Sequence, residues 1–448
     1  MKSVALHNLG CKVNAYELDV MQQFLQNKGY QIVDFHQKAD VYIINTCTVT
    51  NIADRKSRQM IHRAKKQNPD AIVVAVGCYV QTAAQQIEKD PYIDLAIGNN
   101  RKKEIVTIVE EYLRRREEVR EMGEPDQPDK TLSGTTIPDI AAEKEYEEMH
   151  LSKTAEHTRA YIKVQDGCNQ FCTYCIIPFA RGRVRSRAKE DVIREVTDLA
   201  NNGYQEVVLT GIHLSSYGVD LEQEDLLSLI LAVHEVEGIQ RIRLGSLEPR
   251  IITEEFAKTI AALPKMCPHF HLSLQSGSDA TLKRMNRKYD TARFMESVRL
   301  LREHFENVAI TTDLITGFPQ ETEEEFSETL AFIRAVGFAD MHIFPYSIRP
   351  GTPAAKMEQI EKSVKEERAA RAAAVAAEMH KEYLLSCIGQ RFEVLFEQEK
   401  GGRYLGHAPN YMPVSVEGAD LHNKVLTVEI TGLHGDGLSG TITEGGNV

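Results

Sequence analysis

The sequence lacks any long run of apolar residues. No stretch approaches the roughly 18 uncharged apolar residues that a membrane-spanning helix needs. The first segment, MKSVALHNLGCKVN, turns polar too early for a secretory signal peptide. These two absences argue against a membrane protein and a secreted protein, and they predict a cytoplasmic protein with no membrane partner.

An excess of positive charge is also missing. The chain carries 53 Lys and Arg residues against 65 Asp and Glu residues, a net charge of −12. This balance argues against a protein that coats nucleic acid with a uniformly basic surface, so any RNA site must be a local basic patch. The length of 448 residues predicts roughly two to four domains.

Residues 1–115 alternate short apolar runs with amphipathic stretches. The apolar runs are typical of buried parallel strands: 3–9, 41–44, 71–76 and 95–97. Helical patterns lie between them, and the first is expected to end at Gly29. The alternation predicts a doubly wound α/β domain with a parallel sheet. Residues 116–152 are polar, acidic and Pro-containing, which predicts an extended linker.

Residues 153–385 return to strand–helix alternation. Six apolar runs are candidate strands: 159–165, 206–209, 241–244, 269–273, 309–315 and 341–344. Helical patterns follow most of them, which favours a partial (β/α)6 barrel over a full eightfold barrel. A long helix rich in Ala, Glu and Arg is expected from about 363 to 385.

Residues 388–448 have a shorter rhythm. Brief alternating runs are separated by Gly-rich turns: 391–397, 412–416, 424–430 and 438–442. This pattern predicts a small antiparallel β-barrel as the last domain.

The eight cysteines, in a reducing compartment, favour metal ligation or catalysis over a disulfide framework. Cys168, Cys172 and Cys175 form a C-x3-C-x2-C run directly after the first strand of the second domain. Three such thiolates can hold three irons of a [4Fe–4S] cluster and leave the fourth iron open to a small molecule. The alternative is a zinc site, which would want a fourth ligand that the following IIPFAR segment does not contain.

Three further cysteines are far apart in sequence but occupy equivalent places. Cys11, Cys47 and Cys78 each follow a predicted strand, in LGC, NTC and VGC. The carboxyl ends of parallel strands gather at one edge of a sheet, so these thiols can converge on a second cluster. The alternative is that each is a small buried apolar residue. Cys267 and Cys387 stand alone and are expected to be structural.

The motifs LGCKVN, NTCTVT, VGC and DGCNQFCTYCIIPFARGR together resemble those of the radical S-adenosylmethionine methylthiotransferases. The resemblance covers essentially the whole chain. It implies an N-terminal methylthiotransferase domain, a radical core and a C-terminal TRAM barrel. It also implies two [4Fe–4S] clusters, one on each cysteine set: the radical triad, Cys168, Cys172 and Cys175, and the auxiliary triad, Cys11, Cys47 and Cys78.

The chemistry that this resemblance implies is a radical reaction at an adenine of tRNA. The C2–H bond of adenine is too strong for side-chain acid–base catalysis, so a cofactor must carry the reaction. S-adenosylmethionine would supply both a 5′-deoxyadenosyl radical and the methyl group. The implied partners are tRNA, a sulfur donor and an electron donor such as flavodoxin or ferredoxin. No catalytic side chain beyond the cluster ligands is expected.

Polar residues near the strand ends are candidate contacts for S-adenosylmethionine, since such groups suit a ribose and an amino-acid moiety. Tyr174, inside the cysteine run, is expected to pack beside the adenine. The other candidates, each of which could equally be a cap or turn residue, are Thr210, Gly211, Ser246, Glu248, Gln275 and Asp313.

Within the family, the sequence resembles the branch that acts on N6-threonylcarbamoyladenosine at position 37 of tRNA, beside the anticodon. Lys12 and Val13 follow the first cysteine, where the isopentenyladenosine branch tends to carry a Gln-Met pair. Isopentenyladenosine and a ribosomal-protein aspartate remain alternative targets. A non-catalytic iron–sulfur carrier that docks on RNA remains an alternative from another class.

Three basic segments are candidates for RNA contacts. The first alternates in ARGRVRSR: Arg181, Arg183, Arg185 and Arg187. On an extended segment these would share one face and could bind phosphate, and Arg181, Arg183 or Arg185 could bind the substrate carboxylate; pairing with the acidic linker is the alternative. A second set is expected to be mainly a solvated helix face: Arg55, Lys56, Arg58, Arg63, Lys65 and Lys66. In the acidic last domain, an RNA patch would surround Lys400, Arg403, Tyr404 and His407.

Overall fold

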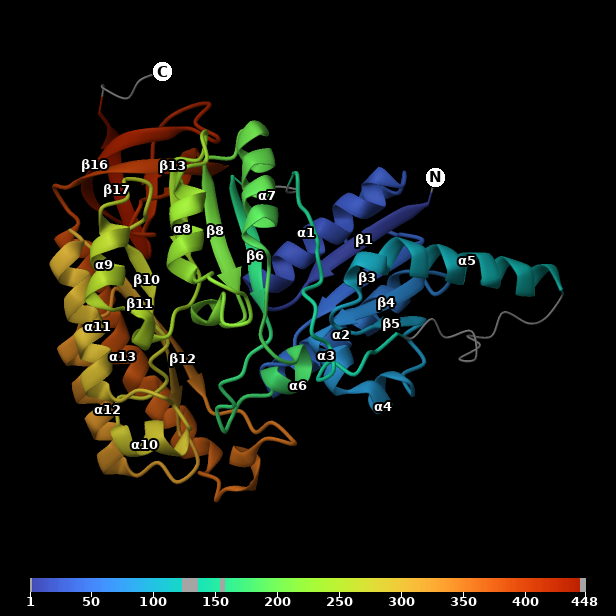
Figure 1. The fold of residues 1–448 in the computed structure, drawn as a ribbon, viewed down its shortest axis with the longest axis horizontal. Helices are drawn as coiled ribbons and strands as arrows, with labels where there is room; N and C mark the ends of the chain where they lie inside the picture. The colour runs from blue at the N-terminus through green and yellow to red at the C-terminus, as the bar shows by residue number, and fades with distance from the viewer. Residues whose placement is uncertain (1, 123–135, 154–157, 444–448) are drawn as a thin grey trace.

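The computed structural model describes residues 2–122, 136–153 and 158–443. Figure 1 shows three folded parts: an N-terminal sheet with its helices, a central curved sheet with helices on its outer side, and a C-terminal barrel against one end of the central part. Within the described ranges, no helix is long and apolar enough to cross a bilayer.

The N-terminal domain is a parallel sheet in the order β2-β1-β3-β4-β5. Its strands are β1 Ser3–Asn8, β2 Gln31–Val33, β3 Val41–Thr46, β4 Ile72–Gly77 and β5 Leu95–Ile97. Its helices are α1 Lys12–Asn27, α2 Asn51–Gln67, α3 Cys78–Thr82, α4 Ala84–Ile87 and α5 Ile105–Glu121. Because α1 and α5 cover one face and α2 the other, β3 and β4 are completely buried. The predicted doubly wound fold is confirmed; β2, short and partly exposed, was not predicted.

The central domain contains all six strands that the sequence predicts, in a parallel arrangement. They are β6 Arg159–Asp166, β8 Glu206–Gly211, β9 Arg241–Leu244, β10 His269–His271, β11 Ala309–Thr316 and β12 Asp340–Pro345. A bridge between Leu247 and Leu272 continues the sheet from β9 to β10. A short strand, β7 Arg185–Ser186, pairs antiparallel with β6.

Helices cover the outer side of this sheet (Figure 1). They are α7 Lys189–Asn201, α8 Leu226–His234, α9 Glu254–Ala261, α10 Asp279–Arg284, α11 Thr291–His304, α12 Glu323–Val336 and α13 Lys362–Ser386, whereas α6 Ile177–Arg181 lies beside α3 of the N-terminal domain. Short 3-10 helices are Lys102–Glu104, Leu214–Ser216, Pro249–Ile251 and Pro353–Lys356. The predicted partial barrel and its long closing helix are confirmed.

The central barrel is open at one side, and the N-terminal domain lies against the opening. In the described part of the chain no strand pairing joins β12 to β6. Helix α1 packs beside β6 (Figure 1), and Arg349, after β12, pairs with Asp54 of α2 at 2.8 Å. The N-terminal domain thus contacts the central domain on both sides of the opening, beside β6 and after β12.

The C-terminal domain is a closed barrel in the order β13-β14-β15-β17-β16. Its strands are β13 Arg391–Lys400, β14 Arg403–His407, β15 Pro413–Val416, β16 Val425–His434 and β17 Gly437–Ile442. All neighbouring pairs are antiparallel except β15 and β17, which pair in parallel. The short strand β14 was not predicted. Cys387 is buried in this domain's core, which agrees with a structural role.

The segment expected to be an extended linker is partly helical and partly packed. Helix α5 runs to Glu121, six residues beyond the expected boundary at 115. Further on, Met149 and Leu151 are fully buried between the first two domains, and the Met149 carbonyl accepts a hydrogen bond from Tyr16 at 2.6 Å. These apolar residues pack the stretch against the folded domains, although its overall composition is polar and acidic and therefore predicted a linker. Residues 123–135 lie outside the described ranges.

Candidate functional site

The auxiliary triad lies at the carboxyl ends of three neighbouring strands. Cys11 follows β1 and caps α1, Cys47 follows β3, and Cys78 follows β4 as the first residue of α3. Strands β1, β3 and β4 are adjacent in the sheet. A Cβ atom at Gly10 would come within 3.2 Å of the Cys47 Cβ, which shows how closely the cysteine-bearing loops approach. The structure thus brings together the three thiols that the strand ends predicted.

The radical triad lies in the loop that follows β6. The Cys168 amide donates to the Gly182 carbonyl at 3.0 Å, so the loop folds back on the segment after α6. Gly167 has φ +70°, and a Cβ there would lie 1.8 Å from the Arg183 carbonyl oxygen. Only glycine allows this approach, so Gly167 fixes the direction in which the loop leaves the strand.

Burial keeps several of these thiols protonated when no metal is bound. Desolvation raises the pKa of Cys47 to about 12 and that of Cys168 to about 11. Metal binding needs thiolates and must therefore release protons at both triads.

Each triad receives a hydrogen bond from an arginine. Arg181 Nε donates to Cys78 Sγ at 3.2 Å, and Arg287 Nη1 donates to Cys172 Sγ at 3.3 Å. Asn99 Nδ2 adds a second donor to Cys78 Sγ at 3.6 Å. Donors that carry positive charge suit thiolate sulfur better than neutral thiol.

A buried charge network adjoins the auxiliary triad through Arg181, which donates to Cys78. Two carboxylates and four cations form it: Glu17 and Asp166, and Lys102, Lys163, Arg181 and Arg185. Burial alone would raise the pKa of Glu17, but its cationic neighbours hold that pKa well below the usual range. The cations exceed the carboxylates by two (4 − 2), so this buried region suits an added negative charge.

These donor sets fit iron–sulfur clusters better than single metal ions. Among the described residues, no three His, Cys, Asp or Glu side chains converge as they would around one ion. A cluster places several irons and sulfides between its thiolates and so holds them farther apart. Cationic donors and excess positive charge also match an anionic thiolate-bound cluster, whereas neither gives a zinc site its missing fourth ligand.

The candidate S-adenosylmethionine residues lie at the ends of successive barrel strands. Thr210 and Gly211 end β8, and a Cβ at Gly211 would come within 2.8 Å of Gln165 Oε1. Ser246 follows β9 and is exposed. Glu248 is buried; burial alone would raise its pKa, but hydrogen bonds from His213 and Arg250 lower it to about 2.

Two further candidates sit side by side across β10 and β11. The backbone N–H of Gln275 donates to the backbone carbonyl of Asp313 at 2.9 Å, and Gln275 has φ +71°. Asp313 lies 3.2 Å from His271 Nε2 and keeps 30% of its side chain exposed. Tyr174 packs edge-on against Phe318, with ring centres 6.4 Å apart, and burial raises its pKa. The strand-end residues therefore border the inner side of the barrel, while Tyr174 is held against an aromatic neighbour.

The chain matches two protein families. Residues 162–333 match the Radical SAM superfamily, and residues 3–98 match the uncharacterized protein family UPF0004. Over 438 residues the chain is 41% identical to the threonylcarbamoyladenosine tRNA methylthiotransferase MtaB of Bacillus subtilis, covering 96% of this chain and 94% of that one. The chain belongs to the radical S-adenosylmethionine methylthiotransferases. It is therefore an enzyme of this class, and the predicted cofactors of the family, [4Fe–4S] clusters and S-adenosylmethionine, are confirmed.

Other relatives of this methylthiotransferase divide between two names. This chain is 40% identical to the MtaB of Aquifex aeolicus, over 95% of this chain and 100% of that one. It is 34% identical to the tRNA-2-methylthio-N(6)-dimethylallyladenosine synthase of Alkaliphilus oremlandii, over 99% and 93%. A solved structure of the radical S-adenosylmethionine methyltransferase TsrM of Kitasatospora setae has the same fold, with TM-score 0.53 and 16% identity over 90% of this chain and 77% of that one.

The basic run of this methylthiotransferase does not form one exposed face. Arg181, Arg185 and Arg187 are fully buried, and Arg187 pairs with Glu148 of the acidic segment and with Glu195. For Arg187 the alternative of pairing with the acidic segment is confirmed. The run begins at the end of α6 and continues through the edge strand β7. Its side chains that point inward are buried, and buried charges need partners of opposite charge.

Only Arg183 of this run is exposed, and its guanidinium lies 4.5 Å from the ring centre of Phe171. The C-terminal patch differs from expectation, whereas the α2 set is mainly an exposed helix face, as expected. Tyr404 is buried in the core of the C-terminal barrel and cannot belong to an RNA patch on its surface. On α2, Lys65 pairs with Asp94 at 2.7 Å, whereas Arg55 and Lys56 remain exposed.

A second cluster of cations was not found from the sequence. Tyr411 inserts its ring among three of them, at centroid distances of 5.5 Å to Lys12, 5.1 Å to Arg159 and 4.5 Å to Arg243. Tyr411 has φ +72°, a conformation that is rare for an aromatic residue. No local motif joins these positions, which come from all three domains.

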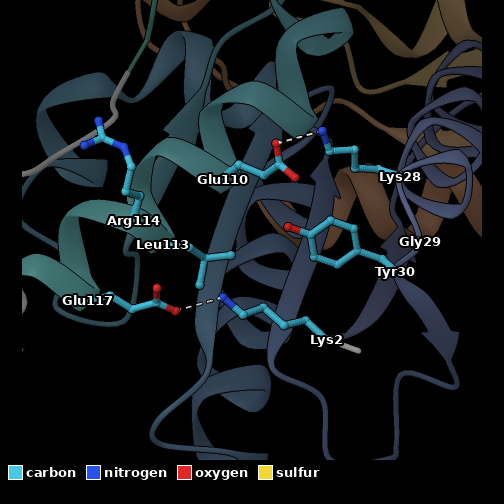
Figure 2. A pocket seen from close by; sticks show the side chains of 8 residues that line it. All are labelled: Lys2, Lys28, Gly29, Tyr30, Glu110, Leu113, Arg114 and Glu117. Atoms are coloured by element: carbon cyan, nitrogen blue, oxygen red, sulfur yellow. Dashed lines mark hydrogen bonds and ion pairs between the residues drawn. The ribbon is translucent and has the colours of Figure 1, made fainter.

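Figure 2 shows a groove in the N-terminal domain. It measures about 350 Å³ and runs between α5 and the edge of the N-terminal sheet. Its cations are paired across it: Lys2 with Glu117 at 3.2 Å, and Lys28 with Glu110 at 3.4 Å (Figure 2). This groove contains no cysteine and no strand-end residue of the candidate site.

Proposed function

We propose that this enzyme adds a methylthio group to C2 of N6-threonylcarbamoyladenosine beside the anticodon of tRNA. The observation that carries the proposal is the pairing of two cysteine triads across one domain junction, with Arg181 reaching from the radical core to Cys78. Its relatives named for threonylcarbamoyladenosine are 36–41% identical, against 33–34% for relatives named for dimethylallyladenosine. That order of similarity favours the first substrate.

In this proposal each triad holds one [4Fe–4S] cluster. When bound, the clusters and S-adenosylmethionine supply the radical, the sulfur and the methyl group. The side chains of the protein bind and orient these groups. Arg181 and Arg287 stabilise the negative charge of the thiolates. Polar groups at the strand ends orient the ribose and amino-acid moieties of S-adenosylmethionine. Glu248 is already engaged with His213 and Arg250, so its role is to fix those neighbours as much as to contact a ligand.

The proposal extends to partners and setting. A reducing electron and a replacement sulfur must come from outside the chain, and we expect a flavodoxin or ferredoxin and a sulfur donor to provide them in the cytoplasm. The exposed residues of the segments singled out earlier remain candidates for phosphate contacts: Arg183, Arg55, Lys56, Arg63, Lys66 and Lys400.

The proposal is tested by supplying the anaerobically reconstituted enzyme with two tRNAs, one bearing threonylcarbamoyladenosine and one bearing isopentenyladenosine. Mass spectrometry of the nucleosides should show methylthiolation of the first. Methylthiolation of the isopentenyl substrate alone would contradict the substrate and leave the enzyme class intact.

A further inference from the structure

The cations around Tyr411 lie at the amino end of the barrel strands, where the C-terminal barrel covers the central domain. Arg159 opens β6, Arg243 lies in β9, and His269 opens β10 with its ring centre 4.8 Å from that of Tyr411. His407 of β14 stacks on the other side at 5.0 Å. The loop that carries Tyr411 thus forms part of the floor of the barrel.

This floor carries more positive charge than its acidic partners balance. Four cations face two carboxylates: Lys12, Arg159, Arg241 and Arg243, and Glu206 and Glu397. The carboxylates are both engaged, since Glu206 binds Arg243 at 2.9 Å and Glu397 binds Arg159 at 3.2 Å. In the described part of the chain, no carboxylate lies within ion-pair distance of Lys12. The Lys12 ammonium is therefore the cation of this group that has no carboxylate partner among the described residues.

Buried polar atoms beside Lys12 also lack partners. Arg243 is completely buried, yet its Nη2 has no hydrogen-bond partner among the described residues; Arg159 Nη1 and His269 Nδ1 are in the same state. Unmade hydrogen bonds on buried groups cost free energy, so they mark a place where a ligand can complete the set. Two of the three are guanidinium donors, which match a carboxylate.

The position of Lys12 connects this floor to the reaction site. Lys12 is the residue after Cys11, the exposed member of the auxiliary triad, and its side chain extends to Tyr411. Farther along the inner face, Thr311 contacts both His269 and His271, and His271 contacts Asp313. A polar wall therefore runs from the floor to a candidate S-adenosylmethionine residue.

We propose that Lys12, held beside Tyr411 with the free guanidinium donors of the floor, binds the carboxylate of the threonylcarbamoyl group. The inference rests on the proposed function and names the part of the site that reads the substrate's side chain. It replaces the expectation that Arg181, Arg183 or Arg185 would do so, since Arg181 and Arg185 are buried and engaged and Arg183 lies over the ring of Phe171. An isopentenyl group carries no charge and no hydrogen-bond acceptor, so it would leave these donors without a partner.

The test compares anticodon stem-loops that bear threonylcarbamoyladenosine, its methyl ester or unmodified adenosine. Binding is measured by fluorescence anisotropy with the full chain carrying both clusters. The wild type should bind the free acid roughly tenfold or more tightly than the ester, as expected for a charge-assisted contact. Lys12→Met, which keeps the apolar stem against Tyr411, should lose most of this preference for the acid and should bind the unmodified RNA as the wild type does.

A matched control lies at the other end of the same helix. Lys28 follows α1 and pairs with Glu110 on the outer surface, so Lys28→Met should retain the preference for the acid. Retained preference in Lys12→Met, or equal weakening for all three RNAs, would overturn the inference, the latter because it indicates a phosphate contact. Methylthiolation of the acid by wild type without discrimination against the ester would overturn the subsite alone. Absence of that product would overturn the proposed function as well.

Discussion

Replacing Arg181 with Met should destabilise the junction between the N-terminal domain and the radical core by about 3 kcal/mol. The Arg181 side chain is completely buried and crosses that junction. Its Nη1 donates to Glu17 at 2.5 Å, its Nη2 donates to Asn14 at 2.8 Å, and its Nε reaches Cys78. Met fills similar space without any of these donors.

The magnitude follows from what remains after the substitution. Removing one partner of a buried ion pair costs about 3–5 kcal/mol because the other charge is left uncompensated. Here Glu17 keeps Lys102 at 2.5 Å and Lys163 at 2.9 Å, and Asp166 keeps Lys163 at 2.7 Å. Neither carboxylate becomes isolated, which places the expected cost at the low end of that range.

The assay is urea unfolding of the cluster-free protein, followed by circular dichroism. Arg183→Met is the matched control, since Arg183 belongs to the same run but is exposed and contacts only the Phe171 ring in the described structure. That change should cost less than about 1 kcal/mol. If Arg181→Met were as mild as Arg183→Met, the buried network would not hold the two domains together. In reconstituted protein, the same substitution should also shift the electron paramagnetic resonance signal of the auxiliary cluster and leave that of the radical cluster unchanged.

Three further predictions follow. Replacing the whole radical triad with Ala should abolish 5′-deoxyadenosine formation while iron remains at the auxiliary triad; product from that variant under reductant would refute the assignment. Cys47→Ala should retain 5′-deoxyadenosine formation but lose methylthiolation, and full methylthiolation would make Cys47 a packing residue. Burial raises the pKa of Asp19 to about 7, so its carboxyl binds a proton more tightly when folded, and stability should fall as pH rises from about 4 to about 7. Asp19→Asn should therefore stabilise the protein by up to about 4 kcal/mol at pH 8 and by nothing near pH 3, as urea unfolding at both pH values would show.

Features that depend on local pattern could be predicted from the sequence. Continuous apolar runs identified β3 and β4, and the placement of cysteines after strands anticipated their convergence, because parallel strands share one carboxyl edge. The strands that were missed are β2, β7 and β14, which are all short, so none of them offers a full apolar run.

Features that depend on distant partners could not be predicted. The alternating arginines looked like an exposed strip, but Arg181 is buried because Glu17, 164 residues away, neutralises it. Likewise Lys12, Arg159 and Tyr411 come from three domains, and only the assembled fold brings them together. A cation's environment depends on what the tertiary structure places beside it, which single-sequence patterns do not record.

The central claim is tested most directly by nucleoside analysis of tRNA from cells that lack this protein. The account predicts that 2-methylthio-N6-threonylcarbamoyladenosine disappears, that N6-threonylcarbamoyladenosine accumulates in its place, and that the gene restores the product while its Cys47→Ala form does not. Unchanged levels of the methylthiolated nucleoside, or loss of the methylthiolated isopentenyl nucleoside instead, would contradict it.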